Sequence, residues 1–127
     1  MSTPDADAVA LAQSLLDAAR AGDSGLLDSY LSAGAPVELT GSSGDSLLML
    51  AAYHGHVGTV DMLLGHGAEP NTPNDRGQTP LAGAVFKGYT DVARALLTAG
   101  ADPDAGTPSA RAAATMFERA DIQALFS

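Results

Sequence analysis

A spacing of 33 residues runs through the chain and constrains its fold more than any other feature of the sequence. Glycine, alanine and leucine recur at this interval, and glycine marks the same two points in each full period. Matching residues include Gly22, Gly55 and Gly88; Gly34, Gly67 and Gly100; Leu15, Leu48 and Leu81; and Leu31, Leu64 and Leu97. A period between about 20 and 50 residues predicts a solenoid, in which each unit buries its apolar face only against its neighbours.

Each unit predicts two short helices, most clearly in the third unit. Thr79 offers a hydroxyl N-cap, and Pro80 suits the first helical position, where its missing N–H costs nothing. Apolar residues follow at helical spacing until Gly88, which can end the first helix by taking a positive φ. A second helix then begins one or two residues later and ends at Gly100.

The sequence therefore predicts a single all-α domain over residues 1–127, built from about four helix-turn-helix units with short hairpin-like loops. The units cover residues 4–40, 41–73, 74–106 and 107–127, and the first and last are caps. Thr3-Pro4 is expected to open the first helix. In the fourth unit, Thr107-Pro108 is expected to open a helix that continues over 110–117, before a short last helix over 121–126.

Two units carry the motifs of a known family. The third contains Gly77-Gln78-Thr79-Pro80-Leu81, then Leu96-Leu97 and Gly100-Ala101-Asp102, and the second contains Ala51-Ala52, Gly55-His56 and Gly67-Ala68. With this period, the chain over about residues 9–126 resembles the ankyrin-repeat family. The resemblance implies a solenoid shaped like a cupped hand, in which the first helices form the palm and the loop tips form the fingers. It also implies protein binding through those surfaces.

The chain departs from the family pattern after Thr-Pro-Leu. Where the family has a histidine, this chain has Met49 and Ala82, and the second unit has Ser46-Leu47 in place of Thr-Pro. The hydrogen bonds between units that the family obtains from that histidine are therefore missing. Apolar packing must carry more of the stability, and we expect a modest margin.

The resemblance places the partner-binding residues on the palm and the fingers. The palm positions hold Arg20, Tyr53 and Phe86, beside them Ala21, His54 and Lys87, and in the last unit Met116 and Phe117. The finger positions hold Ser42, Ser43, Asp45, Asp75, Arg76 and Gln78. Tyr53 and Phe86 suit interface anchors, because aromatic rings bury a large area at little cost in entropy. The alternative is that both rings only pack between neighbouring units.

Acidic residues outnumber basic ones by 15 to 6, which gives a formal net charge of −9. This charge repels phosphate backbones and anionic lipid heads, so it argues against nucleic-acid and membrane-surface partners. Half of the basic residues, Arg20, Arg76 and Lys87, fall on the palm or the fingers, which predicts a partner protein with an acidic patch. The alternative is chance among so few charges, since Asp45 and Asp75 lie nearby.

The absence of cysteine excludes disulfides and thiolate chemistry. The N-terminus lacks the basic start and apolar run of a signal peptide, and no apolar stretch approaches the ~20 residues that span a bilayer. We therefore expect a cytoplasmic protein. The Ala- and Gly-rich composition, with Asp well ahead of Glu, suggests a bacterial source with a GC-rich genome.

The motifs of catalysis are missing from the sequence. It has no cysteine nucleophile, no Gly-x-Ser-x-Gly elbow and no glycine-rich phosphate loop with a lysine, so we expect no enzyme activity and no cofactor. Zinc sites use histidines at short spacing, so a metal-dependent hydrolase using His54 and His56 is an alternative from another class. These two residues bracket Gly55 at a helix end and need not converge, so we expect no metal. A dedicated inhibitor or chaperone of one enzyme is the alternative among binding proteins.

The C-terminal end predicts a short apolar helix. Ile122, Leu125 and Phe126 can pack inward at i, i+3, i+4, with Arg119 and Asp121 as polar cover. Little helix follows to cover the last groove, so this end could pair with a second copy or a partner. We expect a monomer in preference to a homodimer.

Overall fold

The computed structural model describes residues 4–126. Over this range the chain is helical and forms no strand, apart from one isolated bridge between Thr40 and Ser46. The elements are α1 (Pro4–Ala21), α2 (Ser24–Ser32), α3 (Leu47–Tyr53), α4 (Val57–Gly65), α5 (Pro80–Lys87), α6 (Thr90–Thr98), α7 (Ala110–Met116), α8 (Ala120–Gln123) and the 3-10 helix η1 (Ala124–Phe126). The predicted all-α class is confirmed.

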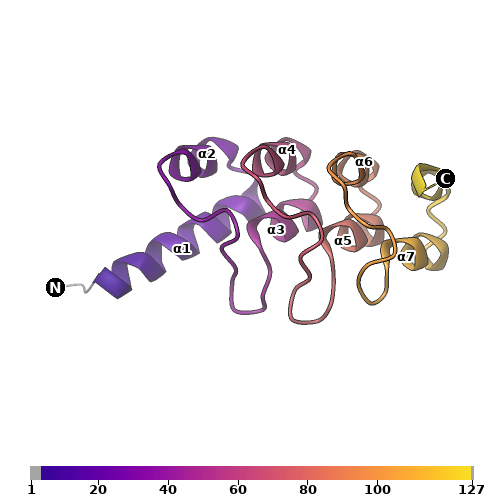
Figure 1. Cartoon of the computed structure of the whole chain (residues 1–127), viewed down its shortest axis with the longest axis horizontal. Coiled ribbons are helices and arrows are strands. Elements are labelled where there is room, and N and C mark those ends of the chain that lie inside the picture. The colour runs from indigo at the N-terminus through magenta and orange to yellow at the C-terminus, as the bar shows by residue number, and fades with distance from the viewer. Residues whose placement is uncertain (1–3, 127) are drawn as a thin grey trace.

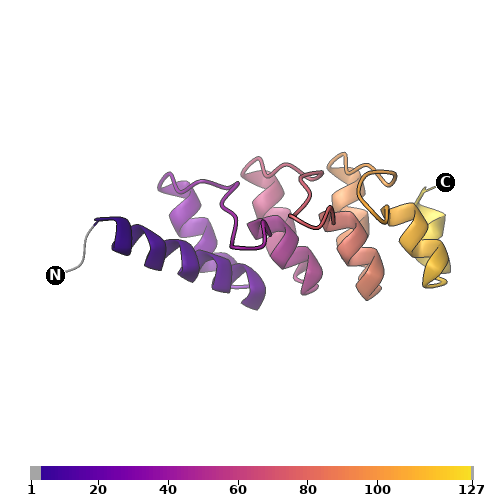
Figure 2. The ribbon, with the colours of Figure 1, turned by 90° about the horizontal axis from the view of Figure 1, so that it is seen from below.

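The helices form two layers that run along the whole stack. In Figure 1, α1, α3, α5 and α7 form an inner row, and α2, α4 and α6 form an outer row above them. Figure 2 shows the inner helices side by side from below, with the two ends of the chain at opposite ends of the row. Each helix packs on its partner in the same unit and on the equivalent helix of the next unit. The predicted solenoid is confirmed.

Hydroxyl caps begin the inner helices of the second and third units. The side chain of Ser46 accepts a hydrogen bond from the N–H of Met49 at 3.0 Å. The side chain of Thr79 accepts one from the N–H of Ala82 at 3.2 Å, and Pro80 is the first residue of α5. Each cap satisfies a backbone donor that the helix itself leaves without a partner.

The start of the last inner helix differs from the prediction. Thr107-Pro108 does not open it, because Ser109 is the N-cap and its hydroxyl accepts the N–H of Ala112 at 3.1 Å. The N–H of Thr107 donates instead to the carbonyl of Gly77 at 3.0 Å, which holds this residue in the loop.

Other predicted boundaries shift by one or a few residues. The proposed cap Thr3 lies outside the described residues, and Pro4 is the first residue of α1. α7 ends at Met116, with Phe117 as its C-cap, and the last helix begins at Ala120 and turns into η1 before Phe126. These shifts are of the size expected at frayed helix ends.

The core consists mainly of leucine, alanine and valine from the repeating positions. The largest buried apolar side chains are Leu15, Leu27, Leu47, Leu48, Leu63, Leu81, Leu96, Ile122, Val60, Val85 and Val92. Ala51, Ala84 and Ala114 are also fully buried on the inner helices. Small side chains at these positions allow neighbouring inner helices to pack closely.

A flat side chain covers the glycine that ends the inner helix of the preceding unit. The pairs are His56 over Gly22, Tyr89 over Gly55 and Arg119 over Gly88. Each glycine has a positive φ, +77° at Gly22, and a Cβ added there would lie 2.6 Å from the imidazole of His56. Both the backbone conformation and the close approach therefore require glycine.

Two of these covering side chains also bond to the preceding unit. His56 Nε2 donates to the carbonyl of Arg20 at 2.7 Å, and a terminal guanidinium N–H of Arg119 donates to the carbonyl of Phe86 at 3.0 Å. The prediction that Arg119 is polar cover for the last unit is therefore wrong, because its guanidinium turns back onto α5. These contacts join consecutive units without the family's usual histidine.

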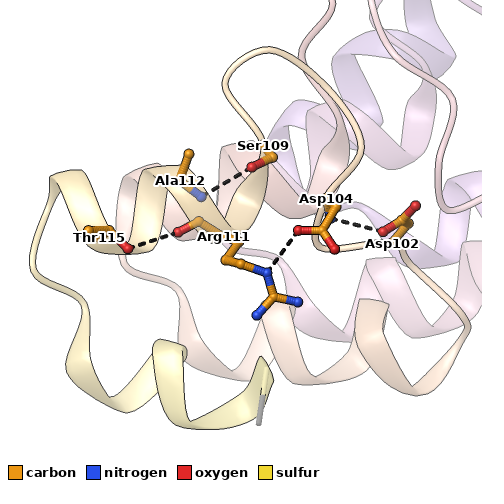
Figure 3. A network of polar contacts seen from close by, with 6 residues as sticks. All are labelled: Asp102, Asp104, Ser109, Arg111, Ala112 and Thr115. Carbon is orange, nitrogen blue, oxygen red and sulfur yellow. Dashed lines mark hydrogen bonds and ion pairs between the residues drawn. The ribbon is translucent and has the colours of Figure 1, made fainter.

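Arg111 of α7 contacts both the loop before α7 and the last helix, η1. Its Nε donates to a carboxylate oxygen of Asp104 at 2.8 Å, and this hydrogen bond lowers the pKa of Asp104 (Figure 3). The guanidinium also lies 5.5 Å from the ring centroid of Phe126, within the range of a cation–π contact. Ile122 is buried and Leu125 half-buried, as the apolar spacing predicts.

The N-terminal end leaves two apolar side chains of α2 exposed. Tyr30 stands at the register position that Leu63 holds in α4 and Leu96 holds in α6. Both leucines are fully buried, whereas Tyr30 is 39% exposed, because no described unit lies beyond α2. Leu26 is exposed for the same reason.

Candidate binding groove

Two loops project beside the inner helices. We name residues 41–45 finger 1 and residues 74–78 finger 2; each follows an outer helix and leads into an inner one (Figure 1). Within each finger, a backbone hydrogen bond joins the first and last residues. The N–H of Asp75 donates to the carbonyl of Ser43 at 3.1 Å, which joins finger 2 to finger 1.

The buried side chain of Asn74 organises both fingers. Its Nδ2 donates to the carboxylate of Asp45 at 2.8 Å and to Oε1 of Gln78 at 3.0 Å. Its Oδ1 accepts the backbone N–H groups of Arg76 and Gln78, both at 3.0 Å. One side chain thus fixes the turn of finger 2 and fastens it to finger 1.

Three aromatic rings form a row across the inner helices. The rings of Tyr53 and Phe86 are stacked, with centroids 6.4 Å apart and planes 8° from parallel. Phe117 meets Phe86 edge-on at 5.0 Å. Phe86 is 45% exposed and the neighbouring Met116 is 65% exposed, so the row packs between units and also offers apolar surface to solvent. The packing of the rings between units is therefore confirmed, and their role as interface anchors stays a prediction.

An apolar hollow of about 230 Å³ lies along this row. Its lining residues are Tyr53, Gln78, Ala82, Gly83, Phe86, Pro108, Ala113, Met116 and Phe117. They come from α3, α5 and α7, the end of finger 2 and the loop before α7. The hollow is therefore built by three consecutive units.

A second, polar hollow of about 290 Å³ adjoins the first and shares Tyr53 and Gln78 with it. It is lined by Arg20, Asp45, Met49, Leu50, Tyr53, His54, Arg76 and Gln78. Arg20 forms an exposed ion pair with Asp17 at 2.8 Å, so its charge is partly compensated. We refer to the two hollows together as the groove.

Positive charge gathers around Tyr53 and His54. The ammonium of Lys87 lies 5.1 Å from the ring centroid of Tyr53. The pKa of His54 is lowered by partial burial and then by the nearby His56, Arg20 and Lys87. The lowered pKa of His54 therefore reflects first its partial burial and second the cationic side chains around it.

The structure places all the sequence-predicted binding residues on accessible surface. Eleven are exposed and three are half-buried: Arg20, Ala21, Ser42, Ser43, His54, Asp75, Arg76, Phe86, Lys87, Met116 and Phe117 in the first group, and Asp45, Tyr53 and Gln78 in the second. Six of the palm and finger residues line the polar hollow, and five line the apolar one, with two shared. Ala21, Ser42, Ser43, Asp75 and Lys87 line neither.

The sequence did not reveal the residues that order the fingers or the small residues that line the apolar hollow. Asn74 carries the hydrogen bonds of the fingers, and Ala82, Gly83 and Ala113 form part of the lining of the apolar hollow. Two signals in the sequence pointed to them: Asn74 is a polar residue before the Thr-Pro motif, and Ala82, Gly83 and Ala113 are small residues on the inner helices.

Two of the three histidines make hydrogen bonds to other parts of the chain. His56 is bonded to the carbonyl of Arg20, and His66 Nε2 lies 2.7 Å from a carboxylate oxygen of Asp28. Over the part of the chain that the structure describes, no three His, Asp or Glu side chains gather in a way that could hold a metal ion. Within the same residues, no helix is long and apolar enough to cross a membrane.

Comparison with known families identifies one matching model, described as ankyrin repeats in three copies, over residues 15–107. The match begins within α1 and ends in the loop before α7, so it includes both fingers and most of the groove. The search of curated proteins finds no match.

Proposed function

The chain belongs to the ankyrin-repeat family, and from this premise we propose that it binds a protein partner in the groove and along the fingers. Members of the family generally act as protein–protein interaction modules and are typically not catalytic. A fold alone does not identify a function, so the proposal depends on the chemistry of the groove.

The observation that carries the proposal is the half-exposed row of aromatic rings. Tyr53, Phe86 and Phe117 come from three different units and meet in one line beside an open hollow. Exposed aromatic rings that are held in place by their neighbours are the usual anchors of protein interfaces, because little entropy is lost when a partner covers them.

The charges favour an acidic surface on the partner. Arg20, Arg76 and His54 line the polar hollow, and Lys87 lies at its edge over Tyr53. The chain as a whole carries a net charge of −9, so the grouping of Arg20, Arg76 and Lys87 is a local reversal of charge, with Asp45 as the acidic residue of the same hollow. Such a local reversal orients an acidic partner toward the groove. We further propose that the protein is a monomer in the cytoplasm of a bacterium.

Removing two rings of the row tests the proposal. We expect Tyr53→Ala together with Phe86→Ala to weaken partner binding at least about tenfold, because both interface anchors are lost. The full chain serves as bait in native lysate, and the affinity of the retrieved partner is then measured by calorimetry for both forms.

Tyr30→Ala is the matched control, since Tyr30 is a partly exposed aromatic residue of α2, away from the groove. It should leave the affinity unchanged. If the folded double variant retrieves the same partner with equal affinity, the groove is not the binding surface.

Binding to an acidic partner should strengthen as the pH falls. A partner carboxylate beside His54 opposes the positive charges that lower its pKa, so the pKa rises in the complex and binding takes up a proton. The affinity begins to rise as the pH falls through the pKa of His54 in the complex. It stops rising below the pKa of His54 in the free protein, which is lowered from 6.5. Arg20, Lys87 and His56 face this imidazole, and Arg76 and Asp45 line the same hollow.

Calorimetry between about pH 7.5 and pH 5 would measure this effect. The matched control is His54→Gln, which keeps His56 and every other titrating group. The difference in affinity between the two proteins should grow toward low pH, and a constant difference would remove His54 from the interface.

A further inference from the structure

Building on the proposed function, we propose that the apolar hollow receives a single apolar side chain from the partner, aromatic or of leucine or methionine size. A carboxylate next to it in the same segment then reaches the polar hollow. The partner therefore offers a short segment that combines one apolar anchor with one acidic residue.

The hollow exists because the inner helices change from large to small residues along the stack. α3 carries Met49 and Leu50 at the positions where α5 carries Ala82 and Gly83, 33 residues later. Gly83 lines the hollow, and a Cβ added there would already lie 3.2 Å from the terminal methyl of Met49 and 3.3 Å from the ring of Tyr53, so any side chain at this position crowds the wall of the hollow. Ala113 continues the small residues on α7.

The size and lining of the hollow fit one side chain. Its volume of about 230 Å³ is below the ~300–1,000 Å³ of typical small-molecule sites. Tyr53, Phe86 and Phe117 supply aromatic walls, and the flexible Met116 stands at the rim with 65% of its surface exposed. Aromatic and thioether walls pack well against another aromatic or unbranched apolar group.

The adjoining polar hollow determines what lies beside the anchor. The two hollows share Tyr53 and Gln78, so a segment that fills one passes directly over the other. Arg76 and Arg20 line that second hollow together with Asp45, and an acidic side chain there gains two cationic neighbours on a chain whose net charge is −9.

Random peptides of about twelve residues, displayed on phage and selected against the full chain, provide the probe. Enriched peptides should carry an aromatic, leucine or methionine residue within a few positions of Asp or Glu. Synthetic copies are then measured by fluorescence anisotropy against variants. We expect Gly83→Leu, which fills the hollow, to weaken them at least about tenfold, and Met116→Ala to weaken them roughly fivefold.

Gly58→Leu is the matched control, because Gly58 is an exposed glycine of α4 with no neighbour within 4 Å of an added Cβ. It should not change the affinity. Thermal unfolding checks each variant, and if Gly83→Leu does not fold, the exposed Met116→Ala decides the question alone.

Peptides that lack an apolar residue, or that bind Gly83→Leu and Met116→Ala as tightly as the parent protein, would overturn the inference. If those same peptides lose binding to the Tyr53→Ala, Phe86→Ala variant, the groove remains the binding surface and only the anchor is wrong. If they bind that variant equally well too, the proposed function fails with it.

Discussion

Replacing Asn74 with alanine is expected to lower the free energy of unfolding by about 2–4 kcal/mol, because four hydrogen bonds of a buried side chain are lost together. The N–H groups of Arg76 and Gln78 lose their acceptor, and Asp45 loses a donor. Urea unfolding at pH 7 measures the loss. Amide exchange should also quicken in both fingers, since Asn74 fastens one to the other.

Asn74→Asp distinguishes the role of the side-chain acceptor from the role of the side-chain donor. It keeps an acceptor for the two N–H groups, but it removes the donor and places a second carboxylate beside Asp45. Repulsion raises the pKa of one carboxyl of this pair above its value in the unfolded chain, so the native state binds the proton more tightly. The deficit in stability should therefore shrink below about pH 5. A deficit that does not change with pH would show that Asp45 and residue 74 are not neighbours.

Replacing Gly22 with alanine is expected to destabilise the protein by about 2–3 kcal/mol. A side chain at its positive φ of +77° costs about 1–2 kcal/mol in backbone strain. The new Cβ would also lie 2.6 Å from the ring of His56, so the ring must move and its 2.7 Å hydrogen bond to Arg20 is lost. That loss adds about 0.5–1.5 kcal/mol, and equilibrium unfolding in urea measures the sum.

Gly67→Ala isolates the backbone part of the effect. Gly67 also has a positive φ, of +91°, but nothing lies within 4 Å of an added Cβ, so only the strain of about 1–2 kcal/mol is expected. Equal losses in the two variants would contradict the contact between Gly22 and His56. In a double-mutant cycle, His56→Ala should cost less in the Gly22→Ala background than in the parent protein.

Most of the fold could be predicted from the period of the sequence. Glycines at fixed spacing mark helix ends, and hydroxyl residues such as Thr79 mark helix starts, because both effects act within a few residues of the chain. The exception is the start of α7. Thr107-Pro108 carries the same local signal as Thr79-Pro80, but a backbone bond to Gly77, in another unit, keeps it in the loop.

The groove could be predicted only in part. The register placed Tyr53 and Phe86 on one stripe, and their stacking follows from that spacing. Asn74 was missed because its role depends on Asp45, which belongs to a different loop. The apolar hollow was missed because it arises from what Ala82 and Gly83 lack, and a missing side chain leaves no motif.

The glycines at the ends of the inner helices have a consequence for building new proteins from these units. The covering group is an imidazole at His56, a phenol at Tyr89 and a guanidinium at Arg119, which differ in charge and hydrogen bonding but are all planar. The contact between consecutive units thus requires a glycine at the end of one inner helix and only a planar side chain in the following unit. Units of this chain should therefore tolerate being duplicated or reordered, provided that each retains its glycine and a planar residue beyond it.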